Sequence, residues 1–386
     1  MIIVLNDVFF LSICFFFMTI SGCIMFKENE ITVWIEMISY GMLFLYFIIH
    51  SKKYKIKYSF FSVFILFLLC IGLMVQDLPF MTILKICFMM VIIWMSIFCT
   101  EGSLDDLSKV RKISYSIINA NILSAFITFL LGGPLIDHLS ENISSWGLSF
   151  GIVYKNYFAA NLLMAFIGVY LYRKYQEKNM MDLFVEVISV IMLVFTFSKG
   201  AWLLLIMFLV IINLDCIYKI KKEQRGILLL IVFLIGVAMA SFIFMEYIVT
   251  VETYLYRLRG LDNYLSYYAD DISHLMFGNG EYVYSSDYGY VEAIRSKTGW
   301  DGTLELAWLN ILIKNGAIGI VGFLLIFLMY IRKIWLFNSR KSKMIYSSIF
   351  AILLASSLVE PYIQSFHGTA FGLYCYMIMS GSYGKS

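Results

Sequence analysis

The chain alternates long apolar runs with short polar breaks. A bilayer core of roughly 30 Å needs about 20 apolar residues in helical form, and runs of that kind recur along the whole sequence. They predict about twelve membrane spans, near 3–25, 31–50, 59–76, 80–100, 113–131, 156–172, 182–197, 201–218, 226–247, 304–330, 345–360 and 366–381. We therefore expect an all-α, polytopic membrane protein, with residues 1–386 forming a single integral membrane domain.

The basic residues determine the expected topology. With the amino terminus inside, the even-numbered connections carry KKYKIK (52–57), KVRK (109–112), RKYQEK (173–178), KIKKEQR (219–225) and RKIWLFNSRKSK (332–343). Together with Lys385 they hold 20 of the 29 lysines and arginines, as the positive-inside rule expects of cytoplasmic segments. Both termini are then cytoplasmic.

Two longer polar segments face outward in this topology, 132–155 and 248–303. The second lies between the ninth and tenth spans and is rich in charged residues and tyrosines, a composition too ordered for a flexible linker. We expect it to fold as a cap of short, partly amphipathic helices on the membrane surface.

Composition excludes a soluble globular domain, because 61% of the residues are hydrophobic, only 14% are charged and the mean hydropathy is +0.84. The 7 cysteines lie mostly in apolar runs without CxxC or zinc spacing, so neither a disulfide framework nor a metal site is expected. Met1–Cys23 has no basic start and no small-residue cleavage site, which favours a retained first span over a signal peptide. A net charge of +3 does not indicate nucleic acid binding.

Outward-facing charges beside span ends are the first candidates for chemistry. In FTFSKGAWL (195–203), Lys199 is either a snorkelling lysine in a helix turn or a fixed cation for an anionic headgroup. In YLYRLRG (254–260), Arg257 and Arg259 suit phosphate oxygens, since a guanidinium binds them bidentately. The alternative for this pair is a surface helix whose arginines pair with acids nearby, such as Glu252 and Asp262.

Two carboxylates precede the tenth span. Asp301 and Glu305 lie four residues apart and share one face if the helix has already begun. Apolar surroundings raise the pKa of a carboxyl group, so either could serve as a general base, although Asp301 also fits a role that complements the helix dipole. His274, which faces outward before LMFGNGEY (275–282), is a further candidate, but isolated histidines are more often interfacial than catalytic.

In these segments the chain resembles the O-antigen polymerase and ligase superfamily of lipid-linked polysaccharide assembly. The resemblance covers 145–325 and rests on four features in the family's order: GIVYKNYFAAN (151–161), FTFSKGAW (195–202), an outward loop with Arg257, Arg259 and Gly278-Asn279-Gly280, and Gly316-Ala317-Ile318-Gly319 in a span. It departs from the family at Lys199, where the family has an arginine, and at Glu305-Leu306, where the ligase branch has a His-Asn pair.

The resemblance implies a glycosyltransferase of the GT-C-like polymerase and ligase fold, acting at the periplasmic face of the bacterial inner membrane. It would need no metal or cofactor, and would join undecaprenyl-diphosphate-linked oligosaccharide repeat units, with a flippase and a chain-length regulator as further partners. We expect Glu305 and then Asp301 as the base. Arg257, Arg259 and Lys199 are expected to bind the diphosphate, and His274, Asn156 and Arg295 to contact substrate.

Three alternatives to a polymerase remain. A ligase of the same superfamily is disfavoured by the missing histidine. A flippase or transporter of the same units would need charges spread along its spans, which hold few, mainly Glu36, Lys85, Glu186 and Lys314. A non-catalytic membrane scaffold would leave the outward arginines without a role.

Overall fold

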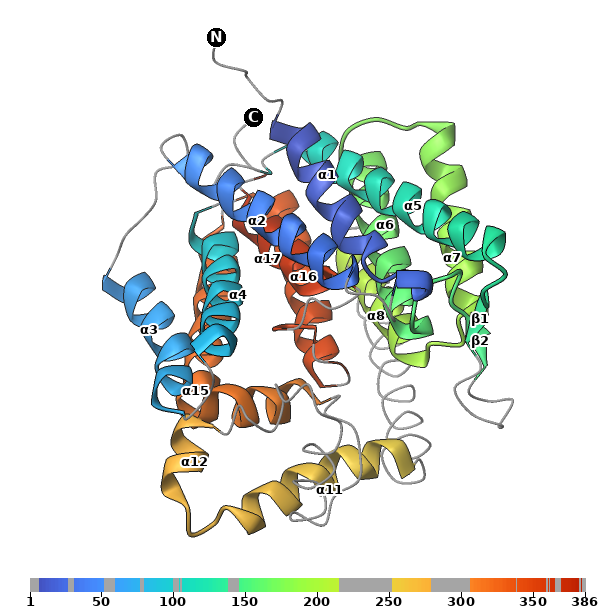
Figure 1. Ribbon diagram of the computed structural model, residues 1–386. Helices are drawn as coiled ribbons and strands as arrows, with labels where there is room; N and C mark the ends of the chain where they lie inside the picture. The colour runs from blue at the N-terminus through green and yellow to red at the C-terminus, as the bar shows by residue number, and fades with distance from the viewer. Residues whose placement is uncertain are drawn as a thin grey trace.

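The computed structural model (Figure 1) describes residues 7–26, 31–51, 60–76, 80–99, 104, 106–137, 146–214, 252–278, 306–337, 339–358, 360, 362–364, 369–381 and 383. This part of the chain is mostly helical. Its α-helices are α1 (Asp7–Ile20), α2 (Ile31–Ser51), α3 (Phe60–Val75), α4 (Phe80–Phe98), α5 (Leu107–Leu130), α6 (Lys155–Tyr175), α7 (Met180–Phe195), α8 (Lys199–Ile212), α11 (Glu252–Tyr267), α12 (Ile272–Phe277), α15 (Ala307–Leu336), α16 (Arg340–Ser357) and α17 (Phe371–Ser380). A 3-10 turn, η1 (Ile24–Phe26), and two strands, β1 (Ile136–Asp137) and β2 (Gly147–Leu148), complete the described elements.

A helix lies over each predicted span except 226–247, which is outside the described residues. Some boundaries differ from those predicted: α5 begins at Leu107, and α15 continues to Leu336. Among the described helices, Ile31–Ile49, Leu107–Leu130 and Ala307–Leu336 are each long and apolar enough to cross a membrane. The expectation of a mainly α-helical chain is thus confirmed, and the described part contains helices that could span a membrane.

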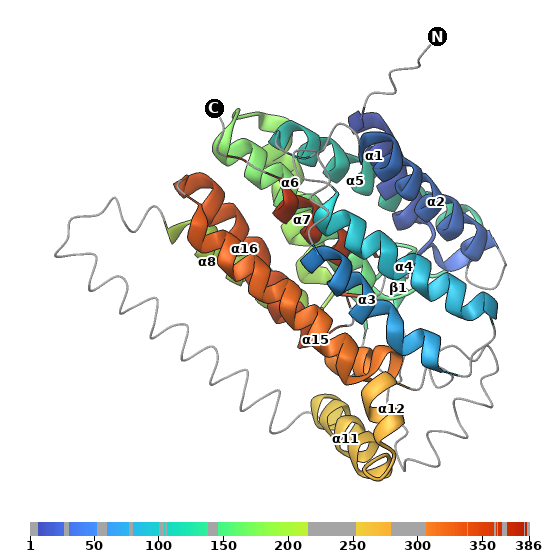
Figure 2. The same cartoon turned by 90° about the vertical axis from the view of Figure 1, so that its left-hand side faces the viewer.

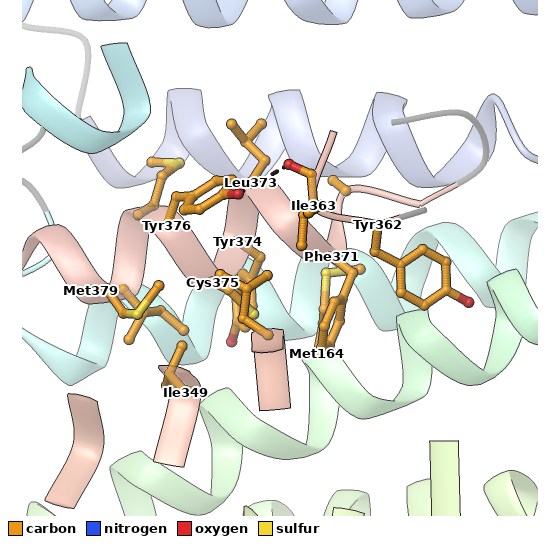
Figure 3. Packing of buried hydrophobic residues seen from close by; sticks show 14 of the residues in the cluster. Met164, Ile349, Tyr362, Ile363, Phe371, Leu373, Tyr374, Cys375, Tyr376 and Met379 are labelled. Carbon is orange, nitrogen blue, oxygen red and sulfur yellow. Dashed lines mark hydrogen bonds between the residues drawn. The ribbon is translucent and has the colours of Figure 1, made fainter. Parts of the chain in front are cut away.

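The core surrounds α17, all of whose residues are buried. Helices α4, α6 and α16 pack against it, and Figure 3 shows Met164 of α6 and Ile349 of α16 among the side chains that surround those of α17. A helix that is apolar on every side belongs in the interior of a helical protein. The peripheral helices instead expose large apolar side chains, such as Phe60 at 88%, as a lipid environment requires.

The connections gather at two ends of the bundle. At the first, which we name the loop end (21–26, 131–155, 196–199 and 358–370, where described), the N–H of Ile24 donates to the carbonyl of Gly151 at 2.8 Å. At the second, the basic end (104–107, 175–180 and 337–340), the amide of Gln176 donates to Asp106 at 2.7 Å. Connections predicted to lie on one side of the membrane therefore meet at one end.

Helix α15 is broken at Gly316, whereas the sequence predicted one continuous span at 304–330. Gly316 has φ +67° and ψ −173°, which separates a first segment, 307–315, from the longer second segment, 317–336. The bend is visible in Figure 2, where α15 turns toward α12. A Cβ at Gly316 would lie 2.1 Å from the carbonyl oxygen of Met276, so the break is built around the backbone of α12.

Two side chains, Gln76 after α3 and Asn315 of α15, hold this junction together. The amide of Gln76 donates to the carbonyl oxygens of Phe277 at 2.6 Å and Lys314 at 2.9 Å. The amide of Asn315 donates to the carbonyl of Leu69 at 2.9 Å. Carbonyls freed by the ends of α12 and the first segment of α15 thus find donors inside the protein, as a non-aqueous surrounding demands.

The described part of the predicted outward loop is helical, as α11 and α12. Tyr264 of α11 is buried in a small apolar cluster with Leu309, Leu312 and Ile313 of the first segment of α15. This packing fixes α11 on the first segment of α15, next to the break at Gly316.

Candidate functional site

The start of α6 is built by the small β1–β2 sheet. Asp137 of β1 pairs with Gly147 of β2, and its carboxylate accepts the N–H of Lys155, the first residue of α6, at 3.2 Å. Phe150 and Gly151, both with positive φ, then turn the chain from β2 toward α6. A carboxylate is favourable at a helix N-terminus, so the sheet both caps and positions α6.

Asn156, a predicted substrate contact, lies at the loop end on the first turn of α6. Its amide donates to Glu360 Oε1 at 2.9 Å, and the hydroxyl of Tyr362 donates to the carbonyl of Asn156 at 3.1 Å. The segment that follows α16 therefore closes over the start of α6. Glu360 was missed in the sequence, because it stands at the boundary of an apolar run and reads as a span end.

The residues after Glu360 pack on α17. The hydroxyl of Tyr376 donates to the carbonyl of Ile363 at 3.0 Å, as Figure 3 shows. A Cβ at Gly372 would lie 2.1 Å from the carbonyl oxygen of Tyr362, so the segment lies directly on this helix. The amide of Gln364 donates to Asn310 of α15 at 2.5 Å. This bond joins the segment that covers the start of α6 to the first segment of α15.

The turn between α7 and α8 explains the FTFSKGAW motif. The hydroxyl of Thr196 accepts the N–H of Ser198 at 3.1 Å, and the indole of Trp202 donates to the carbonyl of Leu193 at 2.9 Å. These bonds satisfy backbone N–H and carbonyl groups that have no partner within the helices where α7 ends and α8 begins. Phe197, between them, has a positive φ of 50°, and Lys199 is exposed as the first residue of α8.

The other predicted residues that the structure describes lie on α11 and α12. Arg257 and Arg259 both belong to α11; Arg259 is exposed, and the side chain of Arg257 is outside the described part. The ring of His274 stacks on Tyr268 with centroids 4.9 Å apart, and its Nδ1 lies 2.5 Å from Asp271 Oδ2. These contacts of His274 stabilise the turn between α11 and α12.

Asp271 caps α12. The backbone N–H of His274 and the His274 ring hold the pKa of its carboxyl group below the ordinary range, because both favour the ionised form. Asp301, Glu305 and Arg295 lie outside the described residues. Leu306, the residue after Glu305, is buried beside Tyr264, and therefore places the start of α15 next to α11.

The structure brings Lys199 and Asn156 to the loop end around α6, and Arg259 and His274 to α11 and α12. The bond between Gln364 and Asn310 connects the two places through the first segment of α15. Cations, carboxylates and amides at this end can bind an anion and assist a proton transfer. Within the described part of the chain, no three His, Cys, Asp or Glu side chains form a possible metal site.

Comparisons with known proteins do not add a family to this geometry. No protein-family model matches the chain, and no curated protein has a detectably similar sequence.

Proposed function

We propose that this protein is a glycosyltransferase of the bacterial inner membrane that polymerises undecaprenyl-diphosphate-linked oligosaccharide repeat units. Its loop end would face the periplasm and its basic end the cytoplasm, with about twelve spans in a GT-C-like fold. The main support for the proposal is that two motifs far apart in the sequence lie at the same end of the bundle: FTFSKGAW with Lys199 and GIVYKNYFAAN with Asn156. There the amide of Asn156 donates a hydrogen bond to the carboxylate of Glu360.

In the proposed reaction, a sugar hydroxyl of the newly delivered repeat unit attacks the anomeric carbon of the growing chain. A glycosidic C–O bond forms, the bond to the diphosphate breaks, and undecaprenyl diphosphate leaves. Lys199, with Arg257 and Arg259, would stabilise the charge that develops on the diphosphate. A carboxylate would accept the hydroxyl proton, with Glu305 as the first candidate and Asp301 as the second.

The buried acidic side chains of α7, which are paired with arginines, argue against the transporter alternative. Glu186 of α7 is bound bidentately by Arg173, with both N–O distances 2.6 Å, and Asp182 accepts from Arg111 at 2.8 Å and Tyr115 at 2.7 Å. Acids held this tightly join helices α5, α6 and α7 at the basic end. They are unsuited to move with a cargo, because breaking a buried pair leaves an uncompensated charge.

The surface polysaccharide of a deletion strain tests the proposal. Loss of long chains with a band of single repeat units retained identifies a polymerase, and complementation with the natural protein restores the long chains. Lys199→Ala should shorten them, while Lys178→Ala, which removes an exposed lysine at the basic end, should not. Absence of any repeat unit would indicate a ligase, and cytoplasmic accumulation of lipid-linked units a flippase; either result refutes the proposal.

A further inference from the structure

Two lysines stand side by side at the loop end, and only one of them belongs to the FTFSKGAW motif. Lys155 begins α6 and Lys199 begins α8, two helices that pack together. Gly147 of β2 lies between them: a Cβ there would come within 2.1 Å of the carbonyl oxygen of Thr196 and 2.7 Å of Lys155 Cδ. The stem of Lys155 and the turn that leads to Lys199 therefore contact the same residue of β2.

The positions of both lysines run against ordinary helix electrostatics. A helix N-terminus carries partial positive charge and favours acidic residues, yet neither α6 nor α8 has an acid in its first turn, and each begins with a lysine. Two helix ends and two ammonium groups therefore lie at one place, and the carboxylate of Asp137, which caps α6, offsets only part of their positive charge. Such an arrangement attracts anions.

The charges around Lys155 have the same consequence. This residue precedes the predicted span at 156–172; its Nζ lies 3.4 Å from the carbonyl oxygen of Trp146. Desolvation lowers the pKa of its ammonium group, Asp137 acts in the opposite direction, and the charge of Lys199 lowers the pKa further. Lys155 and Lys199 are therefore close enough to repel each other, and a bound anion would relieve that repulsion.

We infer that Lys155 and Lys199 together bind the diphosphate of the lipid-linked substrate, one ammonium group to each phosphate. The inference rests on the proposed function and adds to it a residue and a binding mode. A single arginine binds phosphate through a planar fork, which a lysine lacks. Two lysines on neighbouring helix starts, beside Gly147 of β2, restore two points of contact.

Binding of defined lipids to the purified full-length protein in nanodiscs tests this site. Undecaprenyl diphosphate should bind about ten- to a hundredfold more weakly to Lys155→Ala and to Lys199→Ala, the factor expected for one charged hydrogen bond. Lys155→Arg should retain binding, and Lys178→Ala is the matched control. Natural affinity for undecaprenyl diphosphate in Lys155→Ala would overturn the inference.

Two further ligands separate the diphosphate from the lipid tail. The natural protein should prefer undecaprenyl diphosphate over undecaprenyl monophosphate, and each alanine variant should lose that preference. Inorganic diphosphate should displace the lipid from the natural protein but not from the double variant. Equal displacement from both would overturn the inference, because the diphosphate would then be held elsewhere.

The measurement needs neither acceptor nor chain growth, so the two proposals can fail separately. Lysine-dependent binding without polymerisation would refute the proposed function alone. Polymerisation with lysine-independent binding would refute the two-lysine site alone.

Discussion

Replacing Gly316 by alanine tests the junction that attaches α12 and α11 to the membrane helices. Gly316 adopts φ +67° and ψ −173°, a region of backbone conformation that only glycine occupies readily. Its neighbour across the junction, Gly278, also has a positive φ of 87°, and a Cβ there would lie 2.6 Å from the carbonyl oxygen of Ile313. The two backbones are therefore in direct contact at both glycines.

The expected cost of Gly316→Ala has two parts. Forcing a side chain into this conformation costs about 1–3 kcal/mol. The new Cβ would also lie 2.1 Å from the oxygen and 2.4 Å from the carbon of the Met276 carbonyl, which are backbone atoms and move only if α12 moves. Overpacking of this kind costs a further ~1–3 kcal/mol, so the free energy of unfolding should fall by about 2–6 kcal/mol.

Equilibrium unfolding of the purified protein in mixed micelles, followed by tryptophan fluorescence, measures this loss. Gly41→Ala is the matched control: a Cβ at Gly41 meets nothing within 4 Å, and alanine in a helix interior is favoured over glycine by roughly 0.5–1 kcal/mol. A Gly316→Ala protein as stable as the natural one would refute the close contact between α12 and the break in α15.

Three further predictions concern single side chains. Glu360→Gln keeps a hydrogen-bond acceptor for Asn156 and removes only the charge, so the polysaccharide chains should keep their natural length; shortened chains would contradict a positioning role for Glu360. Arg173→Ala leaves the charge of Glu186 buried and should lower the free energy of unfolding by about 3–5 kcal/mol; a loss under about 1 kcal/mol would contradict the buried pair. The depressed pKa of Asp271 means that its cap on α12 is fully present above the ordinary aspartate pKa and is lost as pH falls through the lowered value. Amide hydrogen exchange in α12 should therefore show lower protection in acid, after correction for the intrinsic rate, and no such loss in Asp271→Asn.

The helices were predictable because each needs only a local signal. Runs of about 20 apolar residues had few other stable arrangements, and helices such as α2 lie within a residue or two of the predicted bounds. The end of α15 was misjudged, because the predicted span ended at 330 and the helix continues to Leu336. Lys333 lies in this extension, and its side chain donates to the carbonyl of Met379 at 2.9 Å.

The break in α15 was not predictable from local sequence. Glycines are common in membrane helices, and Gly316 and Gly319 were interpreted as the Gly-x-x-Gly of the resembling family within one continuous span. The break depends on the carbonyl of Met276, some forty residues earlier in the chain, and so on tertiary structure.

The candidate site was partly predictable. Lys199 was found because its motif interrupts an apolar run, and Asn156 was found through the family resemblance. Glu360 and Lys155 became candidates only through their contacts with distant segments. Glu360 meets Asn156 across more than two hundred residues, and Lys155 meets the turn of Lys199 through Gly147. The periodicity of apolar residues does not predict contacts between residues so far apart in the sequence.

Reconstitution of the purified protein in liposomes with undecaprenyl-diphosphate-linked repeat units tests the central claim most directly. The account predicts glycans that grow by whole repeat units, with one undecaprenyl diphosphate released for each new bond, and loss of both products in the Lys155→Ala, Lys199→Ala double variant. Repeat units that cross the bilayer without growing in length, with no undecaprenyl diphosphate released, would contradict it.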